Sequence, residues 1–204
     1  MNFYERRILP YLVHASMRQD AFSTYRRRLL AAAEGRVLEI GLGSGLNMPF
    51  YPPATTQLIG LDPSRKLLSM AHDAKEIVHF PVELFEGSAD AIPLDTGSID
   101  TVATTWTLCS VPDAVQALEE ARRVLKPHGR LLFVEHGRSP AANVRRWQDR
   151  LTPIWKRVGG GCHLNRPIRE LIEQAGFRIE HIDTGYMKGP KPMTFMYEGA
   201  ACPR

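Results

Sequence analysis

The sequence has little cysteine and no long apolar run. Its three cysteines, Cys109, Cys162 and Cys202, are odd in number and lack the close pairing of zinc-binding motifs, so we expect free thiols and no metal site. No stretch approaches the roughly 20 apolar residues of a membrane-spanning helix, and no secretory-type apolar segment opens the sequence. Together these absences favour a protein of the reducing cytoplasm.

The sequence also has no large excess of one charge, since 26 basic and 22 acidic side chains give a formal net charge of +4 over 204 residues. The basic residues form no long patch with interleaved aromatics, so we expect no nucleic-acid partner. Residues 1–35 include a basic run, Arg26 to Arg28, and have two interpretations. They form either a helical lid over a bound ligand or peripheral helices that contact anionic membrane.

Three glycines at alternate positions follow an apolar segment near residue 40. This pattern is typical of a buried strand that ends in a tight turn and opens a helix. Gly41, Gly43 and Gly45 let the turn adopt positive φ and let a ligand approach the backbone. Leu46 stands where a dinucleotide fingerprint has its third glycine, and no triphosphate loop is present, so neither nucleotide class is expected.

An acidic residue follows at the spacing of a ribose-binding carboxylate. Asp62 ends the apolar segment 57–62, about 20 residues after the first glycine, where an α/β nucleotide-binding unit places an acid on ribose hydroxyls. A carboxylate at the end of an apolar strand needs hydrogen-bond donors. The alternative role for Asp62 is to cap the helix that begins near Pro63.

The pattern acid-x-G-x-G-x-G, from Glu39 to Gly45, resembles the first motif of class I S-adenosylmethionine (SAM) methyltransferases. Residues 87–100 resemble the adenine-side loop of that family, except that Ser88 replaces the usual acid. The resemblance implies SAM as cofactor, a small-molecule methyl acceptor, and an adenine contact from either Ser88 or Asp90. The implied cofactor-binding residues are Glu39, Gly41, Gly43, Gly45, Asp62, Pro63, Ser88, Ala89, Asp90, Thr105 and Trp106.

Two of these residues keep a structural alternative. Glu39 either orients the methionine amine of SAM or caps the amides of the glycine turn. Trp106 follows the fourth predicted strand, where its ring either stacks over the sulfonium cation or packs in the core.

The last third of the sequence narrows the resemblance. Glu135-His136-Gly137, Trp147-Gln148 and the segment 160–166 look like the group that includes human alkyl thiol methyltransferases. This implies methylation of small thiols. Related groups leave open a phospholipid head-group N-methyltransferase or a quinone or phenol methyltransferase. The human proteins carry an apolar N-terminal anchor that this sequence does not show, so we do not expect their membrane attachment.

Two histidines are the candidate catalytic acid–base groups, because an unperturbed imidazole titrates near neutrality. His136 follows a predicted strand at its carboxyl end, and His163 lies beside Cys162. The alternative for each is a satisfied core or loop histidine.

Strand and helix patterns alternate along the chain, which predicts an α/β fold with a parallel sheet. The family resemblance implies a Rossmann-like class I methyltransferase fold, a seven-stranded, mostly parallel sheet with helices on both faces. We expect a core at 36–204 with an acceptor-side insertion at about 137–165. Strands are predicted near 36–40, 57–62, 82–86, 99–105, 130–135, 177–183 and 193–199, and helices near 2–18, 20–34, 64–75, 111–125 and 166–175.

Overall fold

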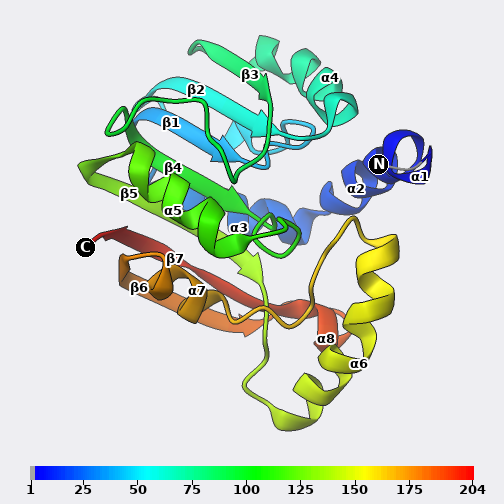
Figure 1. Ribbon diagram of the computed structural model, residues 1–204. Coiled ribbons are helices and arrows are strands. Elements are labelled where there is room, and N and C mark those ends of the chain that lie inside the picture. The colour runs from blue at the N-terminus through cyan, green and yellow to red at the C-terminus, as the bar shows by residue number, and fades with distance from the viewer. Residues whose placement is uncertain (1–2) are drawn as a thin grey trace.

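Seven strands form one sheet in the order β3-β2-β1-β4-β5-β7-β6 (Figure 1). The computed structural model describes residues 3–204, so Asn2 and the predicted helix start at residue 2 lie outside the described residues. Strands β1 to β5 pair in parallel, whereas β7 is antiparallel to β5 and β6. The predicted seven-stranded fold is therefore confirmed. The strands are β1 (Gly35–Ile40), β2 (Thr55–Asp62), β3 (Val82–Glu86), β4 (Ile99–Thr105), β5 (Leu125–His136), β6 (Phe177–Tyr186) and β7 (Phe195–Pro203).

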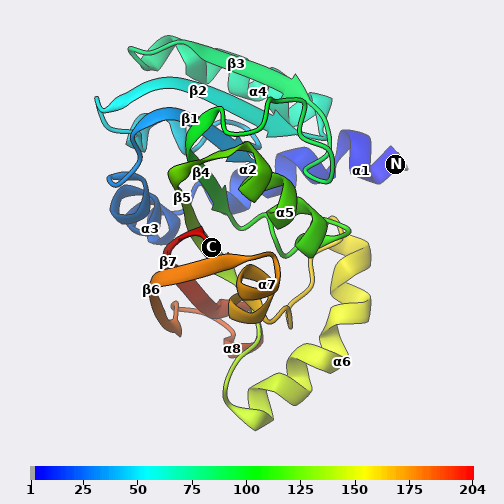
Figure 2. The same cartoon turned by 60° about the vertical axis from the view of Figure 1, so that its left-hand side comes forward.

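Helices cover both faces of the sheet. Alternate strand residues face opposite sides, so Leu131 and Phe133 pack with α5 and α7 while Leu132 and Val134 pack with α3 and α4. Figures 1 and 2 show α5 and α7 on the same side of the sheet. Burial of each such side chain stabilises the fold by roughly 1.5–3 kcal/mol. The helices are α1 (Phe3–Arg7), α2 (Leu9–Met17), α3 (Asp20–Leu30), α4 (Arg65–Ala74), α5 (Ala114–Val124), α6 (Ala142–Val158), α7 (Ile168–Gln174) and α8 (Lys191–Thr194), with 3₁₀ turns at Met48–Phe50 and Lys75–Ile77.

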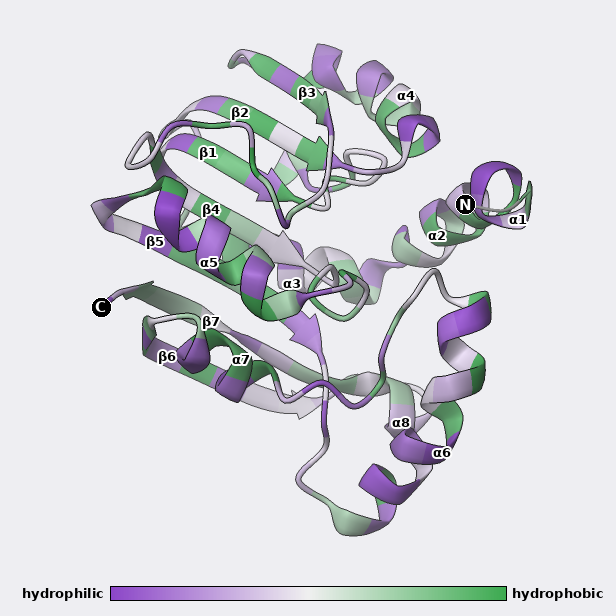
Figure 3. Ribbon diagram, in the orientation of Figure 1, coloured by the Kyte–Doolittle hydropathy of each residue, from purple (hydrophilic) through white to green (hydrophobic). Residues whose placement is uncertain are grey.

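The central strands β1, β2 and β4 contain apolar stretches, whereas the edge strand β6 is largely hydrophilic and the helices carry both apolar and polar residues (Figure 3). Two strands have the predicted bounds, 82–86 and 99–105, and β5 is longer than predicted because it extends back to Leu125. The first predicted helix is divided into α1 and α2. Pro10 lies in the first turn of α2, where its missing N–H leaves no intrahelical bond unmade.

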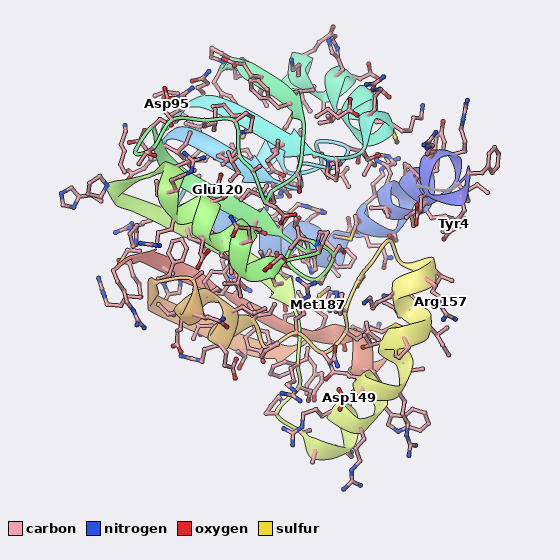
Figure 4. All side chains as sticks on the ribbon, in the orientation of Figure 1. Tyr4, Asp95, Glu120, Asp149, Arg157 and Met187 are labelled. Carbon is pink, nitrogen blue, oxygen red and sulfur yellow. The ribbon has the colours of Figure 1, made fainter. Side chains whose placement is uncertain are left out.

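Helix α6 fills the predicted insertion, for which the sequence indicated no element. It lies beyond the carboxyl end of β5 and carries Pro153 in its interior. Its buried Gln148 fixes it to the sheet side: the amide donates to the Gly137 and Leu164 carbonyls and accepts from Ser139 N–H. At its far end, Val158 C=O accepts a hydrogen bond from Tyr4 of α1, which Figure 4 labels near Arg157.

Among the described residues, no helix combines the length and apolar character that crossing a bilayer requires.

Candidate active site

The glycine turn lies at the carboxyl end of β1, next to the point where the strand order reverses between β1 and β4. Ligands of parallel α/β sheets bind at this point. Gly41, Gly43 and Gly45 all have positive φ, at 73°, 59° and 78°. An added Cβ at Gly41 would lie 2.5 Å from Thr107 Cγ2, so this glycine also permits close packing of the segment after β4.

Asp62, at the end of β2, ties the glycine turn to the next helix. One carboxylate oxygen accepts from Gly43 N–H at 2.9 Å and the other from Ser64 N–H at 2.8 Å. Burial raises the pKa of Asp62, and these two hydrogen bonds act against that rise. Ser64 itself caps α4, and Pro63 between them is exposed. Each carboxylate oxygen keeps a second lone pair, so the turn contacts do not prevent it from accepting from a ribose.

Glu39 is fully buried at the end of β1, between two neutral donors. Its oxygens accept from Asn47 Nδ2 and from the Tyr51 hydroxyl, each at 2.8 Å. Asn47 also donates to Thr105 Oγ1 at 2.9 Å, which joins β1 to β4. Burial raises the pKa of Glu39 to about 8, although the two donors and Arg26 favour its charged form.

Helices α2 and α3 lie against this site. His14 Nδ1 is 2.6 Å from Ser44 Oγ in the glycine turn, and Arg26 Nε donates to Asn47 Oδ1 at 2.7 Å. These contacts make the N-terminal helices part of the wall of the site. Whether they open and close as a lid stays a prediction.

Trp106 is the one described non-glycine residue with positive φ, at 51°. Its ring packs edge-on against Phe22, with centroids 4.9 Å apart, and the Arg26 guanidinium carbon lies 5.3 Å from its centroid. The indole Nε1 is buried and has no hydrogen-bond partner among the described residues. Such backbone strain persists where surroundings enforce it, often at functional sites. The structure therefore places Trp106 between the site and α3, and its role toward SAM remains untested.

Ser88 and Asp90, the two candidates for adenine contact, bond to each other. Ser88 Oγ donates to Asp90 Oδ2 at 3.1 Å and accepts from Asp90 N–H at 3.3 Å. Asp90 Oδ1 is buried without a partner among the described residues, whereas Ala89 between them belongs to the core. Of the two candidates for adenine contact, Asp90 is therefore the one with a buried oxygen that lacks a hydrogen-bond donor in the described part of the chain.

Glu135 and His136 end β5 on the other side of β4. Glu135 is completely buried, and its Oε1 accepts from Thr104 Oγ1 at 2.8 Å and from Thr107 N–H at 3.0 Å. Burial raises its pKa to about 8. His136 Nε2 lies 3.0 Å from Cys162 Sγ, and Nδ1 has no partner among the described residues. Burial lowers the pKa of His136, but the neighbouring Cys109 and Glu135 charges outweigh this and raise it.

His163 contacts backbone rather than His136. Its backbone N–H donates to Cys109 C=O at 2.8 Å, and its ring Nδ1 lies 3.1 Å from the same oxygen. Burial and the Arg166 charge lower the pKa of His163. Arg166, to which the sequence analysis gave no role, is buried and donates to Leu108 C=O at 2.6 Å and Val111 C=O at 2.5 Å.

A surface depression of about 630 Å³ lies at the opposite, amino-terminal ends of the strands and is lined by residues such as Gly35, Lys126 and Gly129. None of the predicted site residues lines it. The candidate site is therefore the carboxyl edge of β1, β2, β4 and β5.

Comparison with known proteins decides the family. The chain is 34% identical to human thiol S-methyltransferase TMT1B over 166 residues, which cover 79% of this chain and 68% of that protein. The chain belongs to the class I SAM-dependent methyltransferases. Residues 38–133 of this methyltransferase match the methyltransferase domain family. Human thiol S-methyltransferase TMT1A is 31% identical over 82% of this chain and 71% of its own length.

Two further matches extend the comparison. The demethylmenaquinone methyltransferase of Oceanobacillus iheyensis is 33% identical over 63% of this chain and 54% of its own length. A SAM-dependent methyltransferase structure from Thermotoga maritima superimposes with a TM-score of 0.71 and 22% identity, covering 98% of both chains. This second match supports the fold alone.

The cofactor of this methyltransferase is SAM, and the residues at the carboxyl edge fit it. The glycine turn has the bare backbone that an adjacent ligand requires, and Asp62 keeps acceptor capacity at the β2 end. The unsatisfied Asp90 Oδ1 matches a hydrogen-bond donor such as the adenine amino group.

Proposed function

We propose that this methyltransferase methylates the sulfur atom of small thiols. The observation that carries the proposal is the 31–34% identity to thiol S-methyltransferases over 79–82% of the chain. SAM supplies an electrophilic methyl group on a sulfonium. The remaining chemical requirement is a correctly aligned sulfur nucleophile, and alignment of two bound reactants is itself a large rate factor.

The proposed division of roles follows the strand ends. Asp62 accepts from the ribose hydroxyls, Asp90 from the adenine amino group, and Glu39 orients the methionine amine. His136 and His163, beyond β5, belong to the acceptor side. This assignment gives cofactor binding to the β1–β3 side and acceptor binding to the β4–β5 side.

A thiol acceptor suits a site without a paired carboxylate base. A thiol has a pKa of about 8.5, so a few per cent is thiolate near pH 7. A phenol or an amine would need stronger deprotonation or exposure of its lone pair. His136, whose Nε2 lies 3.0 Å from Cys162 Sγ, is the proposed acid–base group on this side.

An acceptor panel read out as S-adenosylhomocysteine release tests the proposal. The panel contains alkyl thiols, phenols, reduced quinones, small amines and vesicles with amine head groups. We expect turnover with alkyl thiols to exceed that with every other class by at least about tenfold in kcat/KM. Turnover confined to another class would overturn the thiol assignment and leave the family unaffected.

The second candidate is a quinone methyltransferase, favoured by the match to demethylmenaquinone methyltransferase over 63% of this chain. The panel separates it directly. Peripheral contact of the N-terminal helices with anionic membrane, a phospholipid acceptor and a cytoplasmic location stay predictions, and the vesicle arm tests the first two.

A further inference from the structure

Three metal-binding side chains from three separate segments meet beside the acceptor side of the site. Cys109 follows β4, His136 ends β5, and Cys162 lies between α6 and α7. One donor atom from each lies within 4.8 Å of the other two. Cys109 and Cys162 are buried, and His136 is partly exposed. No other described group of this kind brings two cysteines and a histidine together.

The surrounding hydrogen bonds hold these residues in place. His163 N–H donates to the Cys109 carbonyl, and Arg166 donates to the carbonyls of Leu108 and Val111 on either side of it. The Cys162 segment is thereby fastened to the Cys109 segment. Arg138 N–H also donates to Arg166 C=O at 2.8 Å, which connects the same segment to the chain after His136. The three donors are therefore fixed relative to one another before any ligand arrives.

Arg166 contributes to this fastening as a buried cation. Arg166 is a buried cation whose hydrogen bonds go to carbonyl oxygens, and it forms no ion pair with a carboxylate in the part of the chain that the structure describes. A buried cation needs compensating negative charge nearby. Burial lowers the pKa of Arg166, and Cys109, Glu135, Cys162 and Asp113 act against that lowering. Arg166 therefore fastens the carbonyls on either side of Cys109 rather than pairing with a carboxylate.

We propose that Cys109, His136 and Cys162 bind one zinc ion, with a fourth coordination position that receives the acceptor thiol. Tetrahedral zinc with bonds of about 2.3 Å to sulfur and 2.0–2.1 Å to nitrogen separates its ligand atoms by roughly 3.5–3.8 Å. The observed 3.0 Å between His136 Nε2 and Cys162 Sγ needs an adjustment of about half an ångström to reach that separation. Soft thiolates with imidazole favour zinc over magnesium or calcium.

The proposed metal site differs from the prediction of the sequence analysis, which expected free thiols and no metal site. Cys109 and Cys162 are 53 positions apart (162 minus 109), without the short spacings of zinc motifs. A disulfide between them is the rival explanation, but it would leave His136 Nε2 beside sulfur without a role. Three protein ligands and one free position are the arrangement of catalytic rather than structural zinc sites.

This inference rests on the proposed thiol acceptor. A thiol that binds the ion loses its proton to solvent and stays a thiolate near pH 7. The thiolate sulfur then forms a bond to the methyl carbon, while the sulfonium C–S bond breaks and its electron pair stays on the sulfur of S-adenosylhomocysteine. The products are a neutral thioether, S-adenosylhomocysteine and one proton. A thioether is a weaker zinc ligand than a thiolate, which favours product release.

The test measures metal content before activity. The full chain is purified under reducing conditions without chelator, incubated with zinc, desalted and analysed by mass spectrometry for metals. We expect about one zinc per chain in the wild type and less than about 0.2 in Cys109→Ala, His136→Ala and Cys162→Ala. Cys202→Ala is the matched control, because this third cysteine lies on β7 outside the cluster and should leave zinc content unchanged.

Cobalt substitution gives a second measurement that needs no turnover. Tetrahedral cobalt with two thiolates should show charge-transfer and visible bands, and added alkyl thiol should shift the visible bands. Zinc below about 0.2 per chain in the folded wild type would overturn the metal site, as would unchanged zinc in all three variants. If zinc binds but no thiol is methylated, the proposed function fails while the site stands. Full thiol methylation by the zinc-free enzyme would leave the function and remove the proposed role of the metal.

Discussion

The proposed cofactor side and the proposed acceptor side of this methyltransferase are built in different ways. On the cofactor side, the glycine turn and Asp62 lie within 22 residues of one another along the chain (41 to 62), in the segment that follows β1 and ends with β2. The geometry of this side is determined mainly by backbone conformation and by backbone N–H groups, such as that of Gly43, which donates to Asp62. On the acceptor side, Cys109, His136 and Cys162 meet only through the tertiary structure.

This difference has a physical consequence for each side. A turn that depends on positive φ tolerates almost no side chain, because non-glycine residues are strained there. A cluster held by buried side chains depends instead on the residues that fasten its loops, here His163 and Arg166. We therefore expect the cofactor side to be most sensitive to substitutions that change backbone conformation. We expect the acceptor side to be most sensitive to the loss of single side chains.

The largest effect is expected at Gly41, where the two sides touch. Gly41→Ala strains a residue at φ 73° and pushes its Cβ into Thr107 after β4. We expect a loss of about 2–4 kcal/mol in the free energy of unfolding, with weaker SAM binding, from backbone strain plus overpacking. Urea denaturation and calorimetric titration of SAM measure these.

Gly97→Ala is the matched control for that experiment. Its φ of 67° brings similar strain, but an added Cβ there meets no atom within 4 Å. If the two substitutions lower the free energy of unfolding equally, contact with Thr107 adds nothing to the cost of a side chain at Gly41. The close packing of the two sides would then not contribute to stability.

The next effect is specific to the cofactor. Asp62→Ala removes an acceptor that holds Gly43 N–H and, by our proposal, the ribose, so SAM affinity should fall by about 1–3 kcal/mol. Calorimetry with the folded variant measures it. Glu86→Ala is the control, because Glu86 pairs in register with Asp62 on β3 but is exposed. Unchanged affinity in Asp62→Ala would refute the ribose assignment.

The sequence was sufficient where local pattern determines structure. The strands at 82–86 and 99–105 are local features, and their predicted bounds are confirmed. The prediction that the glycine turn opens a helix was wrong, because only the short 3₁₀ turn Met48–Phe50 lies between β1 and β2. Helix α6 was missed because Pro153 and its charged residues obscure the helical pattern, and only three of its residues, Val144, Gln148 and Thr152, are buried. The meeting of Cys109 with Cys162 depends on how the loop after α6 folds back, which no spacing along the chain encodes.

The smallest effect is expected at His163, where a side chain positions a loop without touching the cofactor turn. His163→Ala removes the ring contact to the Cys109 carbonyl, so Cys109 should shift relative to His136. We expect kcat with an alkyl thiol to fall by about tenfold, equivalent to 1.4 kcal/mol, while the SAM dissociation constant stays within about twofold. His163→Asn, whose amide can still donate to that carbonyl, should recover part of the rate, and His128→Ala, at an exposed position of β5, should have no effect. Parallel losses of SAM affinity and turnover in His163→Ala would instead show that the two sides of the site are one structural unit, and the distinction between them would not hold.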